Sequence, residues 1–302
     1  KVICMLHSLI HQQKRLKHQR LFPCKNRYRA KMVEFKKANI KMASQNASNI
    51  VFRKDYTAPD HQIESIDLSF DLIPTCTEVT SKIIAVPQED RKSDDLILDG
   101  DGLTLVSIKI AGEDSFPGQY DMRPGKLIIH NIKERTEIEI VTRINPRNNL
   151  ELSGLYMSKN NYITQCESEG FRRITYFPDR PDILAKYRVV IRAPKDYKDL
   201  LSNGNLVEQG ELLDGRNYAI WEDPFPKPSY LFALVAGNFV AQEQKVTLSD
   251  GREALLQIWT EPANKGKTEF AMQSLVKAIK WDEERFGLDL DLDRFMIVAT
   301  DD

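Results

Sequence analysis

Short segments in which apolar and polar residues alternate are the feature that most limits what this chain can fold into. Residues 63–72 show the pattern well, with apolar side chains at Ile66, Leu68, Phe70 and Leu72 and polar ones at Asp67, Ser69 and Asp71. A period of two is typical of a β-strand with one buried face. Similar runs occur at about 78–87, 95–99, 103–111, 126–132 and 135–144. Helical periods are nearly absent from this part, which argues against a βαβ fold.

Turn-forming residues separate these segments. They are Gly100-Asp101-Gly102, Gly112-Glu113-Asp114, Pro124-Gly125 and Pro146-Arg147-Asn148-Asn149. Glycine, proline, asparagine and aspartate each favour turns for a different steric or hydrogen-bonding reason. Many short strands with turn signals at this spacing predict an antiparallel β-sandwich or β-saddle.

The same pattern continues to about residue 242. Residues 183–193, 218–221 and 230–242 are predicted to be strands, and 200–205 and 213–216 are predicted to be hairpin turns because they contain Asn-Gly and Asp-Gly. The proline-rich run 224–228 is predicted to be a rigid, extended corner.

The character of the chain changes after about residue 240. Residues 253–260 predict one more strand, and 265–286 predict the only strongly amphipathic helix, with apolar positions Phe270, Leu275, Ala278, Ile279 and Phe286 at steps of three and four. Gly287 is a suitable C-terminal stop. Residues 295–299 then predict a buried strand close to Asp302. We therefore expect a second domain to begin near residue 240 and to continue beyond Asp302.

Charge divides the chain in another way. Residues 1–54 hold 14 lysines and arginines and one acid, Glu34, whereas the remainder holds 29 basic and 43 acidic residues. A basic segment with little periodicity fits a disordered or untranslated leader, an organellar transit peptide or a nucleic-acid-binding arm, in that order of preference. Because the first residue is Lys1, we expect a fragment, a processed chain or a read-through. The predicted organisation is a basic leader over 1–49, a β domain over 50–239 and the start of a further domain over 240–302.

Composition narrows the location and the partners. Hydrophobic residues make up 41% and charged residues 29% of the chain, as in soluble globular proteins, and no apolar run approaches the roughly 20 residues of a membrane span. The four cysteines form no CxxC pair, which indicates a reducing compartment. We expect a cytoplasmic protein, or an imported organellar one if the leader is genuine, without membrane or nucleic acid as partner.

One polar stretch, 164–172, stands between predicted strands and ahead of the proline-containing turn 179–182. Polar loops held by a β scaffold commonly carry function. From spacing alone, Glu167 and Glu169 could equally be a solvated loop edge and Gln165 a turn cap. Cys166 is expected to be a small core residue, and Glu169 is expected to pair with Arg172 or Arg173.

Several stretches together resemble one known family. They are 53–60 (RKDYTAPD), 152–156 (LSGLY), 164–172 (TQCESEGFR), 179–182 (DRPD), 201–205 (LSNGN), 223–228 (DPFPKP), 230–237 (YLFALVAG) and 280–287 (KWDEERFG). From about residue 52 onward the chain resembles the N-terminal portion of the bacterial-type alanyl aminopeptidase (aminopeptidase N) family of zinc metallopeptidases. We recognise no resemblance to a known family in residues 1–49.

The resemblance implies a fold and a division of labour. It implies a mainly β chain, with an antiparallel β-saddle domain followed by the opening strands and helix of a thermolysin-like α+β domain. The family's zinc cofactor is held by an H-E-x-x-H helix and a later glutamate, and a G-A-M-E-N loop precedes them. Neither motif is in this chain. The resemblance therefore places the zinc ligands, the catalytic residues and the C-terminal catalytic and helical domains beyond Asp302.

What the resemblance carries over is a substrate-binding pair. Gln165 and Glu167 match the family's Gln-x-Glu, which anchors the free α-amine of a peptide substrate. An aminopeptidase must hold that ammonium at a fixed distance from the metal, and a carboxylate suits an ammonium. Two alternatives remain open. One is a non-catalytic scaffold form of the fold, and the other is the related leukotriene-hydrolase branch, which carries glutamine where this chain has Glu167.

Overall fold

The computed structural model describes residues 2–5 and 53–300. The chain separates into two units, residues 1–8 with 59–302 and residues 9–58. The described part of the second unit contains a short 3-10 helix, η1 (Arg53–Asp55). Most of the predicted leader lies outside the described residues, and its described part is strand β1 (Val2–Met5). The predicted boundaries at residues 50 and 239 stay predictions.

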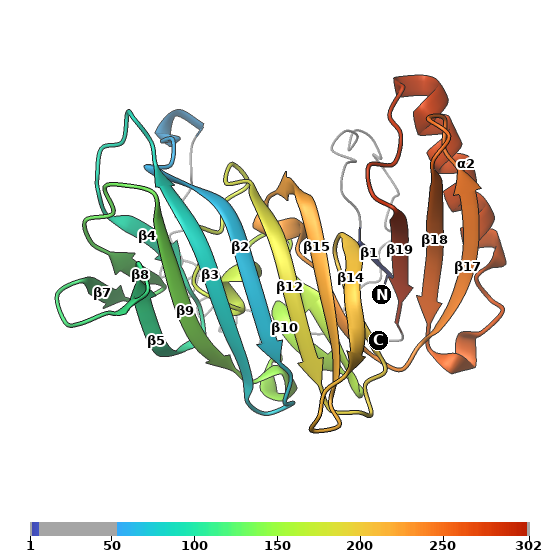
Figure 1. The fold of residues 1–302 in the computed structure, drawn as a ribbon, viewed down its shortest axis with the longest axis horizontal. Coiled ribbons are helices and arrows are strands. Elements are labelled where there is room, and N and C mark those ends of the chain that lie inside the picture. The colour runs from blue at the N-terminus through green and yellow to red at the C-terminus, as the bar shows by residue number, and fades with distance from the viewer. Residues whose placement is uncertain (1, 6–52, 301–302) are drawn as a thin grey trace, which may run out of the picture. The chain divides into compact units, whose positions relative to one another are not determined.

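An eight-stranded sheet dominates the described structure, in the order β14-β15-β12-β2-β3-β9-β5-β6 (Figure 1). Its strands are β2 (His61–Asp71), β3 (Thr77–Pro87), β5 (Thr104–Ile110), β6 (Glu113–Asp114), β9 (Thr136–Ile144), β12 (Ala185–Ala193), β14 (Asn205–Glu211) and β15 (Asn217–Lys227). The pairs are antiparallel except β12 with β2, which is parallel. The purely antiparallel arrangement that the sequence predicted is wrong at that one pair.

The alternating segments supply the core of this sheet. Ile66, Leu68 and Phe70 of β2 are buried, as are Ile138 and Ile140 of β9, while the polar residues between them lie on the other face. The period-two pattern therefore predicted the correct strands here because one face of the sheet packs inward. The mainly β fold class is confirmed.

Two smaller sheets pack against the same core. One has the order β4-β8-β7 and the other β10-β11-β16-β13. Their strands are β4 (Leu96–Asp99), β7 (Tyr120–Arg123), β8 (Lys126–Ile129), β10 (Gly154–Ser158), β11 (Asn161–Gln165), β13 (Asp199–Ser202) and β16 (Leu234–Gly237). Short 3-10 helices lie in the connections between the large sheet and the four-stranded one: η2 (Pro146–Asn148), η3 (Phe171–Arg173) and η4 (Ser229–Leu231).

The last part of the chain forms a fourth sheet and a helix. The sheet has the order β1-β19-β18-β17, with β17 (Val240–Thr247), β18 (Glu253–Thr260) and β19 (Arg294–Ala299). After η5 (Pro262–Asn264), helix α2 (Glu269–Phe286) ends at Gly287, whose φ is 64° and whose N–H donates to the Glu283 carbonyl. No helix in the described ranges is long and apolar enough to cross a membrane.

Helix α2 buries only part of the predicted apolar face, since Leu275 and Ile279 pack against the sheet and the two phenylalanines do not. Met272 and Leu275 are buried, whereas Phe270, Trp281 and Phe286 are exposed, Phe270 to 82%. The buried pair packs with Leu256, Ile258 and Phe295 of the sheet. The pattern of threes and fours correctly predicted a helix, but it included apolar residues that the described sheet does not cover.

Two other local predictions are corrected by the observed strands. Asn203-Gly204 is not a hairpin turn, because β13 pairs with β16 and β14 pairs with β15 in another sheet. The Asn203 side chain instead bonds to the segment between β15 and β16, donating to the Leu231 carbonyl and accepting from the Ala233 N–H. The predicted strand 230–242 is divided into η4, β16 and β17.

The proline-rich run is extended, as predicted, but it is part of strand β15 as far as Lys227. The last pair between β14 and β15 joins Asn205 and Glu222. Beyond that point β15 pairs only with β12, so its other edge is free of strand pairing. Proline, which has no N–H to donate, is tolerated at such an edge.

Candidate functional site

The predicted site lies where strand β11 ends. Gln165 is the last residue of β11 and pairs with Gly154 of β10. On the other side, β11 pairs with β16 through only two residues. The Thr164 hydroxyl extends that contact, since it donates to the Leu234 carbonyl at 3.1 Å and accepts from the Leu234 N–H at 2.8 Å. The end of the strand is therefore fixed on both sides.

The loop that follows is anchored at both of its ends. Cys166 is buried, and burial raises the pKa of its thiol well above the usual value, so it is a core residue as predicted and not a nucleophile at neutral pH. At the far end, Phe171 is fully buried and makes edge-to-face contacts with Phe177 and Phe232 at ring distances of 5.1 and 5.3 Å. These aromatic contacts fix where the loop returns to the core.

Gly170 closes the loop and has to be a glycine. Its N–H donates to the Cys166 carbonyl at 2.8 Å. A Cβ atom at this position would lie 2.3 Å from the Gln165 carbonyl oxygen and 3.0 Å from the Gly154 nitrogen. The chain therefore turns tightly from Cys166 to Gly170 and leaves Glu167, Ser168 and Glu169 exposed.

The two predicted substrate-binding residues come together in this loop. The Gln165 side-chain amide donates to the Glu167 backbone carbonyl at 3.3 Å, so its own carbonyl oxygen remains an acceptor. The Glu167–Ser168 peptide bond is cis. Within residues 53–300, no hydrogen bond or ion pair engages the Glu167 carboxylate. The loop thus presents one exposed carboxylate that is free of described partners, next to a neutral acceptor.

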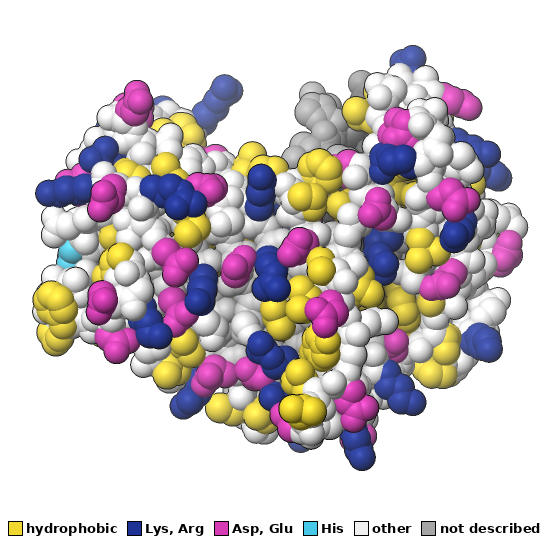
Figure 2. Space-filling view, in the orientation of Figure 1, with side chains coloured by type: hydrophobic (Ala, Val, Ile, Leu, Met, Phe, Trp, Pro, Cys, Tyr) yellow, Lys and Arg dark blue, Asp and Glu magenta, His cyan; other side chains and the backbone are white. Residues whose placement is uncertain are grey.

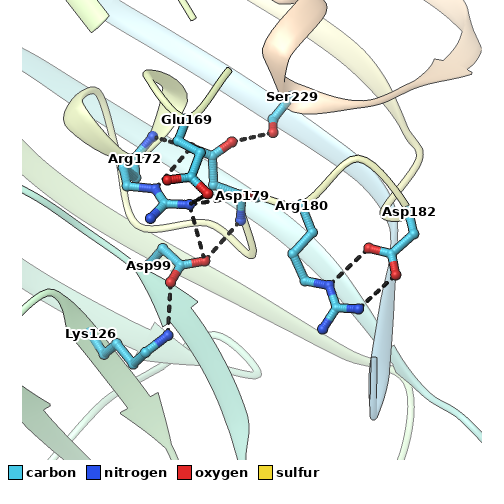
Figure 3. A network of polar contacts seen from close by, with 8 residues as sticks. All are labelled: Asp99, Lys126, Glu169, Arg172, Asp179, Arg180, Asp182 and Ser229. Atoms are coloured by element: carbon cyan, nitrogen blue, oxygen red, sulfur yellow. Dashed lines mark hydrogen bonds and ion pairs between the residues drawn. The ribbon is translucent and has the colours of Figure 1, made fainter. Parts of the chain in front are cut away.

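A network of charged and polar residues includes Glu169 of this loop and Arg172 just after it (Figure 3). We call it the Asp179 network; its members are Asp99, Lys126, Glu169, Arg172, Asp179 and Ser229. The Asp179 carboxylate is buried and accepts from both the backbone N–H and the Nε of Arg172, each at 3.1 Å. The Arg172 guanidinium also donates to the Asp179 carbonyl at 3.1 Å and lies 3.4 Å from the Glu169 carboxylate. The expected pairing of Glu169 with Arg172 is therefore present.

The network connects three separate parts of the chain. The Ser229 hydroxyl of η4 donates to the other oxygen of Asp179 at 2.5 Å. The Asp179 N–H donates to the Asp99 carboxylate at the end of β4, and Lys126 of β8 donates to the same carboxylate at 2.9 Å. Sequence analysis treated 179–182 as a turn and did not find the role of Asp179, because its partners are up to 80 residues away.

A second buried ion pair lies at the end of β15. Lys227 and Asp223 are both buried, with 2.8 Å between the Lys227 amine and the Asp223 carboxylate, and the amine lies 3.8 Å from the Tyr187 ring centroid. Burial lowers the pKa of Lys227 to about 8, although Asp223 opposes that shift. Burial also raises the pKa of the Tyr187 hydroxyl, and Cys166 and Asp179 nearby add to that effect.

A metal centre is not formed by the described residues. No group of three or more histidine, cysteine, aspartate or glutamate side chains in residues 53–300 is arranged to hold a metal ion. The described residues therefore do not themselves fit a zinc ion, in keeping with the resemblance, which assigns the zinc ligands to another part of the family's proteins, and the groups that this loop offers a ligand are a carboxylate and an amide.

Comparison with known proteins places this mainly β chain in the class of peptidase N-terminal domains. The Peptidase M1 N-terminal domain family matches residues 35–231, and the chain belongs to this family. Aminopeptidase N of Escherichia coli (strain K12) is 48% identical over 251 residues, which are 83% of this chain and 28% of that protein. The chain thus corresponds to the N-terminal part of aminopeptidase N and spans less than a third of the length of that relative.

Solved structures agree with this assignment. The crystal structure of Legionella pneumophila aminopeptidase A in complex with aspartic acid is 38% identical, with a TM-score of 0.76, and the match covers 80% of this chain and 29% of that one. An M1 zinc metallopeptidase from Deinococcus radiodurans, bound to a Tyr-Ser-Ala substrate, shares the fold at 14% identity and a TM-score of 0.66, covering 80% of this chain and 56% of that one.

Proposed function

We propose that this chain is the part of a zinc aminopeptidase that anchors the free α-amine of a peptide substrate. The Glu167 carboxylate binds the ammonium group, and the Gln165 side-chain oxygen provides a second, neutral acceptor. The observation that carries this proposal is the exposed Glu167 carboxylate, which has no partner among the described residues, whereas Glu169 of the same loop contacts Arg172. Zinc and the hydrolytic step belong to parts of the protein outside this chain.

The chemistry of the pair supports this role. A charge-assisted hydrogen bond to a carboxylate is worth about 1.5–3 kcal/mol, and the anchored α-ammonium sets the register of the first peptide bond. The relatives support the substrate class, since one is bound to aspartic acid and another to a Tyr-Ser-Ala peptide. Peptides with a free N-terminus are therefore the proposed partners.

The test is made on the complete protein. Glu167→Ala is expected to lower kcat/KM for an aminoacyl-arylamide by about 10- to 150-fold, mainly through KM, because the lost bond is worth about 1.5–3 kcal/mol. Glu211→Ala removes an equally exposed carboxylate from β14 and is expected to change nothing. An unchanged kcat/KM for Glu167→Ala would remove the anchor assignment.

The isolated chain provides a second test. We expect the 302-residue chain to show no hydrolysis of the same substrate, with or without added Zn²⁺. Zinc-dependent turnover by this chain alone would contradict the proposed division of labour. A complete protein without peptidase activity would instead favour a non-catalytic scaffold form of the fold.

A further inference from the structure

We infer that Arg172 and Asp179 are positioning residues that hold the Glu167 carboxylate in place and keep it available. This inference rests on the proposed function of Glu167. It concerns two side chains whose effect on the site passes through the loop 166–170.

Arg172 is fixed to the protein interior. The guanidinium has one strong partner, the buried Asp179 carboxylate, and a second contact to the Asp179 backbone carbonyl. The backbone N–H of Arg172 bonds to the same carboxylate. A buried carboxylate that accepts several hydrogen bonds from one arginine holds that arginine in one geometry.

Asp179 is itself fixed from two directions. Ser229 donates to its free carboxylate oxygen, and its backbone N–H is held by Asp99. Asp99 is paired with Lys126 on a neighbouring strand. The base of the network therefore joins η4, β4 and β8, which are parts of the packed core and not mobile loop ends.

Arg172 in turn fixes the loop. It follows Phe171 at the start of η3, two residues after Gly170, whose N–H closes the turn to Cys166. Its guanidinium also reaches back to Glu169 at 3.4 Å. Both the backbone at the end of the loop and one of its exposed side chains are thereby held by the same arginine.

The contact between Arg172 and Glu169 also distinguishes the two carboxylates of the loop. The loop exposes two carboxylates, Glu167 and Glu169, only two residues apart. Arg172 contacts the Glu169 carboxylate, although it shares its charge with the buried Asp179, whereas no described residue contacts the Glu167 carboxylate. An incoming ammonium therefore meets one carboxylate in this loop that has no cationic neighbour, which favours Glu167 as the anchor.

The experiment is a double-mutant cycle in the complete enzyme. Arg172→Met is expected to raise KM for an aminoacyl-arylamide and to lower kcat/KM by about 10- to 100-fold, because a displacement of about 1 Å in a positioning group has effects of that size. Arg172→Lys is expected to recover part of the loss, since it restores the charge but not the forked geometry. Arg143→Met removes an arginine paired with Glu78 on the large sheet and serves as the matched control.

The decisive measurement is the same substitution in a Glu167→Ala background. If Arg172 acts through Glu167, Arg172→Met then has less than a twofold further effect on kcat/KM. If the two losses multiply, the positioning inference is wrong even though the anchor proposal stands. If Glu167→Ala alone has no effect, the anchor proposal itself fails.

A milder variant serves as a control for misfolding. Glu169→Gln leaves Arg172 and Asp179 paired and releases only the exposed arm of the network. It is expected to fold like the wild type by its melting temperature and to raise KM about two- to fivefold, an effect that should also disappear in the Glu167→Ala background. An unchanged KM for Glu169→Gln would overturn the part of the inference that involves Glu169.

Discussion

Two charged regions of this molecule are built from the same residue types but lie in different surroundings. The first, which we call the outer row, crosses the exposed face of the large sheet, where charges of alternating sign face one another on neighbouring strands (Figure 2). Its members, in register, are Glu222, Arg188, Asp67, Lys82, Glu139 and Lys109. The second is the Asp179 network behind the loop.

The two regions differ in how far their charged side chains are exposed to water. In the outer row, Glu139 lies 3.1 Å from Lys82 and 3.2 Å from Lys109, but both lysine side chains are more than 40% exposed. In the network, the Asp179 side chain is 1% exposed and Arg172 is 23% exposed. Exposed pairs contribute little because water and salt compete for each charge, whereas a buried charge that loses its partner is costly. Loss of a charged partner should therefore destabilise the protein strongly in the Asp179 network and hardly at all in the outer row.

The largest effect is expected from Asp179→Ala. It leaves the Arg172 guanidinium and the Ser229 hydroxyl without their shared acceptor, and breaking a buried pair in this way costs about 3–5 kcal/mol. Urea denaturation of the 302-residue chain, compared with wild type, measures the change in unfolding free energy. A cost below about 1 kcal/mol, as for an exposed pair, would show that burial does not distinguish the two regions.

The contrast between the regions also separates what the sequence could predict from what it could not. Strands β2, β3 and β9 were predictable because each has one buried and one exposed face, and Asp67, Lys82 and Glu139 of the outer row lie on their exposed faces. Strands β10 and β11 were not predicted, since Leu155, Tyr156, Tyr162 and Ile163 are all buried and leave no alternation to detect.

The candidate site was also only partly predictable from the sequence. The motif and its family resemblance singled out Gln165 and Glu167 in a polar loop, but not the strand β11 that ends at Gln165; their role in binding stays a prediction. Cys166 was correctly expected to be a core residue, because it lacked any catalytic pattern. The Asp179 network could not be predicted, since its contacts join Asp99, Asp179 and Ser229, and no local pattern specifies which distant residues meet.

The second prediction concerns the buried Lys227 and its dependence on pH. Its pKa is about 8 in the folded protein, against 10.5 for an ordinary lysine. Between these values the unfolded chain binds more protons than the folded one, so the lysine's contribution makes the unfolding free energy rise with pH. From pH 8 to pH 10 the rise should be about 2 kcal/mol, at about 1.36 kcal/mol for each pH unit.

The comparison variant for this effect is Lys227→Met, which removes the titrating group while keeping an apolar stem of similar length. The difference between wild type and variant should grow in favour of wild type from pH 8 to pH 10, as measured by urea denaturation at each pH. A flat difference over that range would show that the amine keeps its proton, as an exposed lysine does.

The smallest effect is expected in the outer row, from Glu139→Gln. Burial alone would raise the pKa of Glu139, but hydrogen bonds from Lys82 and Lys109 outweigh it and leave the pKa below its ordinary value. The carboxylate therefore contributes stability that is present at neutral pH and is lost as the pH falls through its lowered pKa. Because its partners are largely exposed, we expect a cost of about 0.5–1 kcal/mol at low salt.

Salt distinguishes this loss from the one at Asp179. In about 1 M NaCl the Debye length falls to about 3 Å, so the cost of Glu139→Gln should become too small to measure, while the cost of Asp179→Ala should stay nearly the same. Urea denaturation of both variants at low and high salt makes the comparison directly. If the two costs decreased in parallel, the network would be as open to solvent as the outer row, and Arg172 could not hold the loop against water in the way that the anchor requires.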